Sequence, residues 1–135
     1  MRFFVPGEIE YSTRQDDFCL QLMLQTAAYL LAWNPGLKIF FDGRPFSRRY
    51  QIENVLTASA SLHQPWRIVE CICSDETVKQ RLEADAKTGN HRAGNRDYQL
   101  YLEVKVRFET ITHPKIVIHT DQPLEVCIEQ ALQGL

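Results

Sequence analysis

The chain has 135 residues, a formal net charge of −2 and a pI of about 6.1. This length suits one domain or most of one, and 44% hydrophobic with 24% charged residues is typical of a soluble globular protein. The slight acidity argues against a general nucleic-acid or membrane-surface binder, and no apolar run approaches the roughly 20 residues that span a bilayer. The apolar stretch at the start of the chain is too short for a secretory signal, so we expect a cytoplasmic protein.

Helices and strands alternate along the chain, which predicts an α/β protein with a mainly parallel sheet flanked by helices. We expect one domain, in which residues 1–36 form an irregular start and a long helix and residues 37–135 form the core. The long helix is apolar on most of its faces, which is typical of a helix buried on several sides. In chain order, the first predicted elements are a helix over 14–33, a strand over 37–41, a helix over 46–62 and a strand over 66–73. They are followed by a helix that starts at 74–76, a polar loop over 88–97, a helix over 97–109, a strand over 115–119 and a last helix over 123–132. We expect Ser12 or Thr13 to cap the first helix, and Tyr98 and Tyr101 to lie in the core.

The four cysteines bear on the question of a metal. Cys71 and Cys73 lie two residues apart on an apolar run, so in a strand their side chains share one face. No second Cys or His pair has the spacing of metal ligands, and we therefore predict buried free thiols and no metal centre.

The most informative stretch is the apolar run that ends in Asp42 and Gly43. A buried parallel strand in this place would deliver the Asp42 carboxylate to the carboxyl edge of the sheet, where ligands of open α/β sheets bind. Three arginines follow at the start of the next helix, and with its free N–H groups they would attract a phosphate. Two other interpretations stay open: the acid caps the helix, and the arginines lie on a solvated face. The arginines are Arg44, Arg48 and Arg49.

Several segments together resemble a known family. They are the stretch from Leu37 to Arg49, the run Glu70-Cys71-Ile72-Cys73-Ser74 leading to Val78-x-x-Arg81-Leu82, the lid-like stretch from Gly89 to Asp97, and the ending Ile118-His119-Thr120-Asp121-Gln122-Pro123-Leu124-Glu125. From about Leu37 to Leu132, roughly 70% of the chain, the sequence resembles the P-loop kinase-like family of AAA-ATPase type, whose relatives include gluconate kinases, chloramphenicol phosphotransferases and zeta-toxin-like kinases.

The resemblance implies a P-loop NTPase fold and ATP-dependent phosphoryl transfer, with Mg²⁺, to a small molecule or nucleotide. Asp42 would be the catalytic acid near the metal and the acceptor hydroxyl. Asp85 stands where the family's lid motif, R-L-x-x-R, often has its second arginine. The implied substrate-anion contacts are Arg44, Arg48 and Arg49, and the implied nucleotide lid is Arg81, Arg92 and Arg96.

One part of the family pattern is missing. The chain contains no G-x-x-x-x-G-K-[ST], the loop that binds a nucleotide's phosphates, and the family's first βαβ unit would precede Met1. We therefore expect the C-terminal part of an ATP-dependent kinase that is inactive alone. The alternative is a non-catalytic remnant that binds a partner protein or an anionic ligand. Without the central strand the sheet would keep unpaired edges, so we also expect self-association or a complementing chain.

Overall fold

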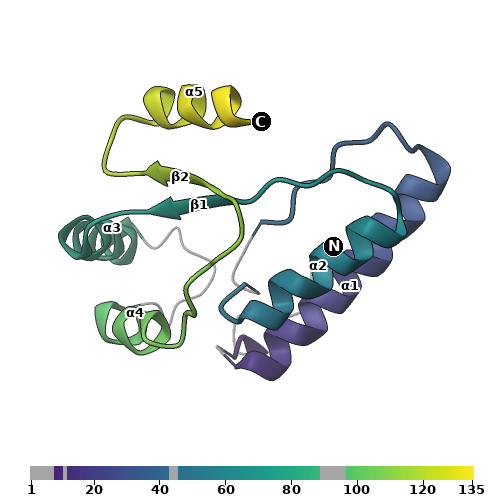
Figure 1. The fold of residues 1–135 in the computed structure, drawn as a ribbon. Coiled ribbons are helices and arrows are strands. Elements are labelled where there is room, and N and C mark those ends of the chain that lie inside the picture. The colour runs from purple at the N-terminus through teal and green to yellow at the C-terminus, as the bar shows by residue number, and fades with distance from the viewer. Residues whose placement is uncertain (1–7, 11, 43–45, 89–96) are drawn as a thin grey trace. The chain divides into compact units, whose positions relative to one another are not determined.

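A computed structural model describes residues 8–10, 12–42, 46–88 and 97–135. Over these residues the chain is a mixed α/β protein with five helices and one two-stranded parallel sheet (Figure 1). The mixed α/β class and the parallel pairing were both predicted. The chain divides into two compact units, one built from Glu10–Trp66 with Arg107–Thr110 and the other from the remaining residues. None of the helices in the described ranges has both the length and the apolar character that crossing a membrane demands.

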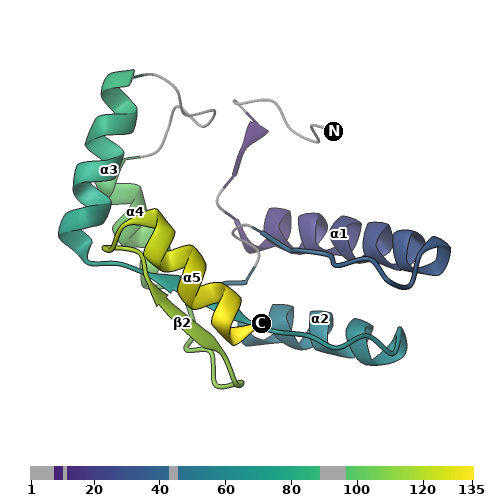
Figure 2. The same cartoon turned by 90° about the horizontal axis from the view of Figure 1, so that it is seen from above.

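Helices α1 (Thr13–Trp33) and α2 (Arg49–Ser61) form the first unit and lie side by side (Figures 1 and 2). The predicted cap of α1 is confirmed, because the Ser12 hydroxyl accepts a hydrogen bond from the Gln15 backbone N–H at 3.2 Å. The core between the two helices consists of Leu20, Ala27 and Ile52.

The prediction that α1 is buried on several sides was wrong for this structure. Tyr29 is 76% and Trp33 is 85% exposed, and only one stripe of the helix packs on α2. An apolar composition shows how much surface a helix could bury, but burial itself depends on how many neighbours the fold provides.

A buried glutamine joins the first turns of α1 and α2. Gln51 is fully buried; its amide N–H donates to the Asp17 carboxylate at 2.7 Å, and its amide oxygen accepts from the Arg48 backbone N–H at 3.0 Å. The Tyr50 hydroxyl donates to the same carboxylate at 2.7 and 2.8 Å. Burial, together with the negative charge of Asp17, raises the pKa of the Tyr50 hydroxyl.

The predicted strand at residues 37–41 was wrong for this structure. These residues form neither helix nor strand, and Phe40 is 77% exposed. A strand exists only when a neighbouring strand pairs with its backbone, and among the residues that the structure describes no strand pairs with this segment. A short apolar run in the sequence indicates that the segment favours an extended conformation, but it does not show whether another strand pairs with it.

The second unit contains the sheet. Strands β1 (Val69–Ile72) and β2 (Ile116–His119) pair in parallel, with Val69 beside Ile116. Both lie within the predicted strands. Helix α5 (Leu124–Gly134) packs on β2, as Figure 1 shows, and Ile118 and Cys127 are the buried side chains of this layer.

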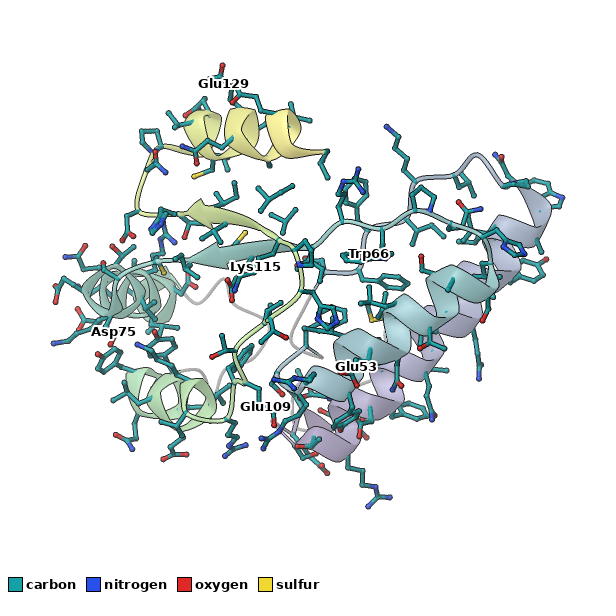
Figure 3. The ribbon with its side chains drawn as sticks, in the orientation of Figure 1. Glu53, Trp66, Asp75, Glu109, Lys115 and Glu129 are labelled. Carbon is teal, nitrogen blue, oxygen red and sulfur yellow. The ribbon has the colours of Figure 1, made fainter. Side chains whose placement is uncertain are left out.

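Helices α3 (Asp75–Thr88) and α4 (Tyr98–Lys105) connect the two strands and lie beside each other. The Asp75 carboxylate joins them: it accepts from the Tyr101 hydroxyl at 2.7 Å and forms an ion pair with Lys105, so it lies on the side of α3 toward α4 (Figure 3). Lys105, and after it the Tyr101 hydroxyl, hold the pKa of the Asp75 carboxyl below its ordinary value. Tyr98 and Tyr101, which we predicted in the core, are only partly buried and stack on each other.

Helix α4 ends earlier than predicted, at Lys105 instead of residue 109. Arg107–Thr110 belong to the other unit, where the Glu109 backbone N–H donates to the Ser47 carbonyl at 2.9 Å. The prediction of buried thiols holds for Cys127 and is wrong for Cys71, which is exposed.

Candidate functional site

The start of α2 holds Arg48 and Arg49, two of the three arginines that the sequence predicted as contacts for an anion. The Glu109 carboxylate accepts a hydrogen bond from the Arg49 backbone N–H at 2.8 Å and from the Arg48 guanidinium at 3.3 Å. Figure 3 labels Glu109 beside this helix start. A helix N-terminus has N–H groups without partners inside the helix, and a negative charge there is stabilised. Two of the predicted arginines therefore bind an anion, and that anion is the protein's own carboxylate.

The electrostatics of this pair match its geometry. The Arg49 backbone N–H, and after it the Arg48 side chain, hold the pKa of the Glu109 carboxyl below its ordinary value. The side chains of Arg48 and Glu109 are 34% and 47% exposed. Dissolved anions can therefore reach Arg48, and a phosphate or carboxylate oxygen could take the place of the Glu109 oxygens.

The structure does not bring the other residues that the sequence predicted for the acceptor, Asp42 and the Arg49 side chain, into contact with Glu109. Asp42 is exposed and follows residues 37–41, which form no strand, so within the described ranges it does not lie at the end of a strand. The Arg49 side chain is exposed, and only its backbone N–H contacts Glu109. Arg44 lies outside the described residues.

A second polar cluster lies at the carboxyl ends of β1 and β2. Asp121, just past β2, accepts hydrogen bonds from the Ser74 backbone N–H at 3.1 Å, the Ser74 hydroxyl at 2.8 Å and the Thr77 hydroxyl at 2.6 Å. These donors, the Thr77 hydroxyl first, lower the pKa of the Asp121 carboxyl to about 2. Because the donors are Ser74, shortly after β1, and Thr77, in the first turn of α3, Asp121 connects the end of β2 to the end of β1.

Arg81, predicted to be part of the nucleotide lid, belongs to this cluster. Its guanidinium donates to the Thr120 carbonyl and, at 3.3 Å, to the Thr120 hydroxyl, and the Thr120 backbone N–H donates to the Ile72 carbonyl at 2.7 Å. Arg81 therefore stabilises the end of β2. The other two predicted lid residues, Arg92 and Arg96, lie outside the described residues.

Sequence reasoning missed the roles of Glu109 and Asp121. The position of Asp121 could have been predicted, because Asp121 follows the predicted strand over 115–119 and Ser74 follows the predicted strand over 66–73. The carboxyl ends of parallel strands meet at one edge of a sheet, so these two residues could be expected to lie close together. The position of Glu109 could not be predicted in this way, since it contacts a helix start 60 residues away along the chain.

The resemblance also implies that Mg²⁺ is bound, which requires carboxylate ligands. Across the part of the chain that the structure describes, no three His, Cys, Asp or Glu side chains come together to hold a metal ion. In enzymes that act on nucleotides, Mg²⁺ is usually held by one or two carboxylates together with substrate phosphates. Asp42, exposed as it is, could supply one such carboxylate.

Comparisons with models of known protein families, with curated proteins and with solved structures found no match to this chain.

Proposed function

We propose that this chain is the acceptor-binding part of an ATP-dependent phosphotransferase that acts on a small anionic molecule or a nucleotide. The observation that carries the proposal is the Glu109 carboxylate bound at the start of α2 by Arg48 and by the Arg49 N–H. Support also comes from the sequence resemblance and from the parallel β1–β2 pair with its helical connection.

In this proposal the phosphate or carboxylate of the acceptor replaces Glu109. The acceptor anion would take one bond from the Arg48 guanidinium and one from the backbone N–H of Arg49, both charge-assisted. Such contacts fix the position of the acceptor, and positioning supplies most of the catalysis in phosphoryl transfer. Asp42 keeps the role that the resemblance implies, the orientation of the acceptor hydroxyl.

The nucleotide side of the reaction needs residues from elsewhere. ATP would supply the phosphoryl group and Mg²⁺ would neutralise its charge, but none of the 135 residues form the G-x-x-x-x-G-K-[ST] sequence that holds the triphosphate. The proposed role of this chain is therefore confined to binding and orienting the acceptor.

A second candidate function is anion binding without transfer, by a remnant of such an enzyme. It is favoured by the same contact, because an arginine already paired with Glu109 is only partly available to a substrate. The two candidates differ in the DNA upstream of the Met1 codon. An in-frame sequence that encodes a glycine-rich loop ending in Lys-Ser or Lys-Thr favours the phosphotransferase, and stop codons favour the remnant.

The anion site can be tested by a titration in which calorimetry measures the binding. Inorganic phosphate, a sugar phosphate and a nucleoside monophosphate are added to the wild-type chain and to Arg48→Gln at constant ionic strength. Losing one charge-assisted hydrogen bond, worth about 1.5–3 kcal/mol, should weaken binding by roughly tenfold or more. Arg14→Gln is the matched control, because Arg14 is an exposed arginine of α1. Equal affinities of the two variants, or no binding by the wild type, would show that Arg48 is not an anion contact.

A further inference from the structure

Over the described ranges, strand β1 pairs along one of its two edges, the one that faces β2. The Ile116 N–H donates to the Ile68 carbonyl at 2.9 Å, and the Thr120 N–H donates to the Ile72 carbonyl at 2.7 Å. In a parallel pair of strands, the backbone N–H and C=O groups of every second residue point toward the partner strand. The groups of Ile68 and Ile72 point toward β2, so the N–H and C=O groups of Val69 and Cys71 point away from it. Within the described ranges no other strand pairs with this edge.

The outer edge of β2 is different, because its own turn covers it. The outward carbonyl of His119 accepts from the Gln122 side-chain amide at 2.9 Å and from the Cys127 thiol at 3.6 Å. Among the residues that the structure describes, none covers the corresponding edge of β1 in this way: Val69 is 39% exposed and Cys71 is exposed, and neither is Lys or Pro, the residues that usually protect an edge. Since two strands alone make a marginal sheet, this edge is the place where a further strand is expected.

We propose that the further strand is β1 of a second copy of this chain, paired antiparallel about a two-fold axis at Cys71. The result is a continuous four-stranded sheet in the order β2, β1, β1 of the second copy, β2 of the second copy. The association does not depend on the proposed function.

Charge selects both the occupant and the register. The one charged residue of β1 is Glu70, and Lys115 neutralises it at 2.7 Å, so two copies of the edge can meet without net repulsion. A register centred on Glu70 would place the two Glu70 side chains opposite each other, which is unfavourable. A register centred on Cys71 places Glu70 opposite Ile72 of the second copy. It also brings Arg67 toward the acidic first turn of the other copy's α3, where Asp75 and Glu76 lie.

The register makes a chemical prediction. Two residues that face each other in a hydrogen-bonded antiparallel pair have Cα atoms about 5.5 Å apart. A disulfide accepts Cα separations of about 4.4–6.8 Å. Cys71, a free and exposed thiol, should therefore form a bond with Cys71 of the second copy when an oxidant takes up two electrons and the two thiol protons are released.

Two experiments test the association. Sedimentation velocity under reducing conditions should show a dimer of the wild type at tens of micromolar, and Val69→Lys should raise the dissociation constant by about tenfold or more. Val117→Lys is the matched control, since Val117 is 40% exposed and lies on the other strand; it should leave the dimer intact. Circular dichroism confirms that both variants are folded.

In the second experiment, mild oxidation with diamide should give a covalent dimer with wild type and with Cys73→Ser, and none with Cys71→Ser. A wild type that sediments as a monomer, a dimer lost equally in Val69→Lys and Val117→Lys, or a cross-link that survives Cys71→Ser would each overturn the proposal. If Val69→Lys fails to fold, the oxidation result decides by itself.

Discussion

The buried Gln51 side chain gives a quantitative test of how α1 and α2 are held together. Replacing it with leucine keeps the volume and removes both hydrogen bonds, the one to the Asp17 carboxylate at 2.7 Å and the one from the Arg48 N–H at 3.0 Å. A bond to a charged group is worth about 1.5–3 kcal/mol, and a neutral one about 0.5–1.5 kcal/mol. The leucine recovers part of this loss by burying apolar atoms. We expect Gln51→Leu to lower the free energy of unfolding by about 2 kcal/mol.

Urea denaturation followed by circular dichroism measures this change. With a slope of about 1–3 kcal/mol per molar urea, a loss of 2 kcal/mol moves the midpoint down by about 1 M. Gln25→Leu is the control, because Gln25 is exposed on α1 and should change the midpoint little. A Gln51→Leu chain as stable as the control would show that the glutamine does not hold the two helices together.

Three further predictions concern the second unit. Ile118→Ala should destabilise the chain by about 2–5 kcal/mol in urea denaturation, because Ile118 is 2% exposed, whereas Val117→Ala should cost much less. Gly134→Ala should destabilise it by about 1–3 kcal/mol, because the new Cβ would lie 2.6 Å from the Ile116 side chain; a higher melting temperature would contradict that close approach. The pKa of Asp121 is about 2 in the folded state against an ordinary value of 3.8, so its stabilisation is present above about pH 4 and is lost as the pH falls toward 2. Asp121→Asn should therefore have a flatter stability profile than the wild type over this range, and parallel profiles would contradict the assigned hydrogen bonds.

Helix caps, helix starts and two of the strands could be predicted because each depends on residues that are close together in the sequence. The cap at Ser12, the helix start after Ser74 and the parallel strands around Val69–Ile72 and Ile116–His119 all follow from short-range chemistry and hydrophobic periodicity. The strand predicted at residues 37–41 failed for the opposite reason. A strand needs a partner from elsewhere in the chain, and no short window shows whether the partner is present.

The candidate site divides in the same way. Arg48 and the Arg49 N–H could be expected to bind an anion, since arginines at a helix start attract negative charge. That the anion is Glu109 could not be foreseen, because residues 107–110 leave the unit of α4 and join that of α2. The fold shows that Glu109 occupies the contacts at the start of α2 that the sequence predicted for a bound anion.

The most direct test of the central claim is therefore the competition at the start of α2. Inorganic phosphate is titrated into the wild type, Glu109→Gln and Glu53→Gln at pH 7 and constant ionic strength, with calorimetric detection. Glu53 lies exposed on α2, and its replacement removes the same negative charge without touching the contact to Arg48 and Arg49 (Figure 3). The account predicts roughly tenfold tighter phosphate binding by Glu109→Gln than by the wild type, and wild-type affinity for Glu53→Gln. Phosphate affinity that is no higher in Glu109→Gln than in Glu53→Gln would contradict an anion site at this helix start.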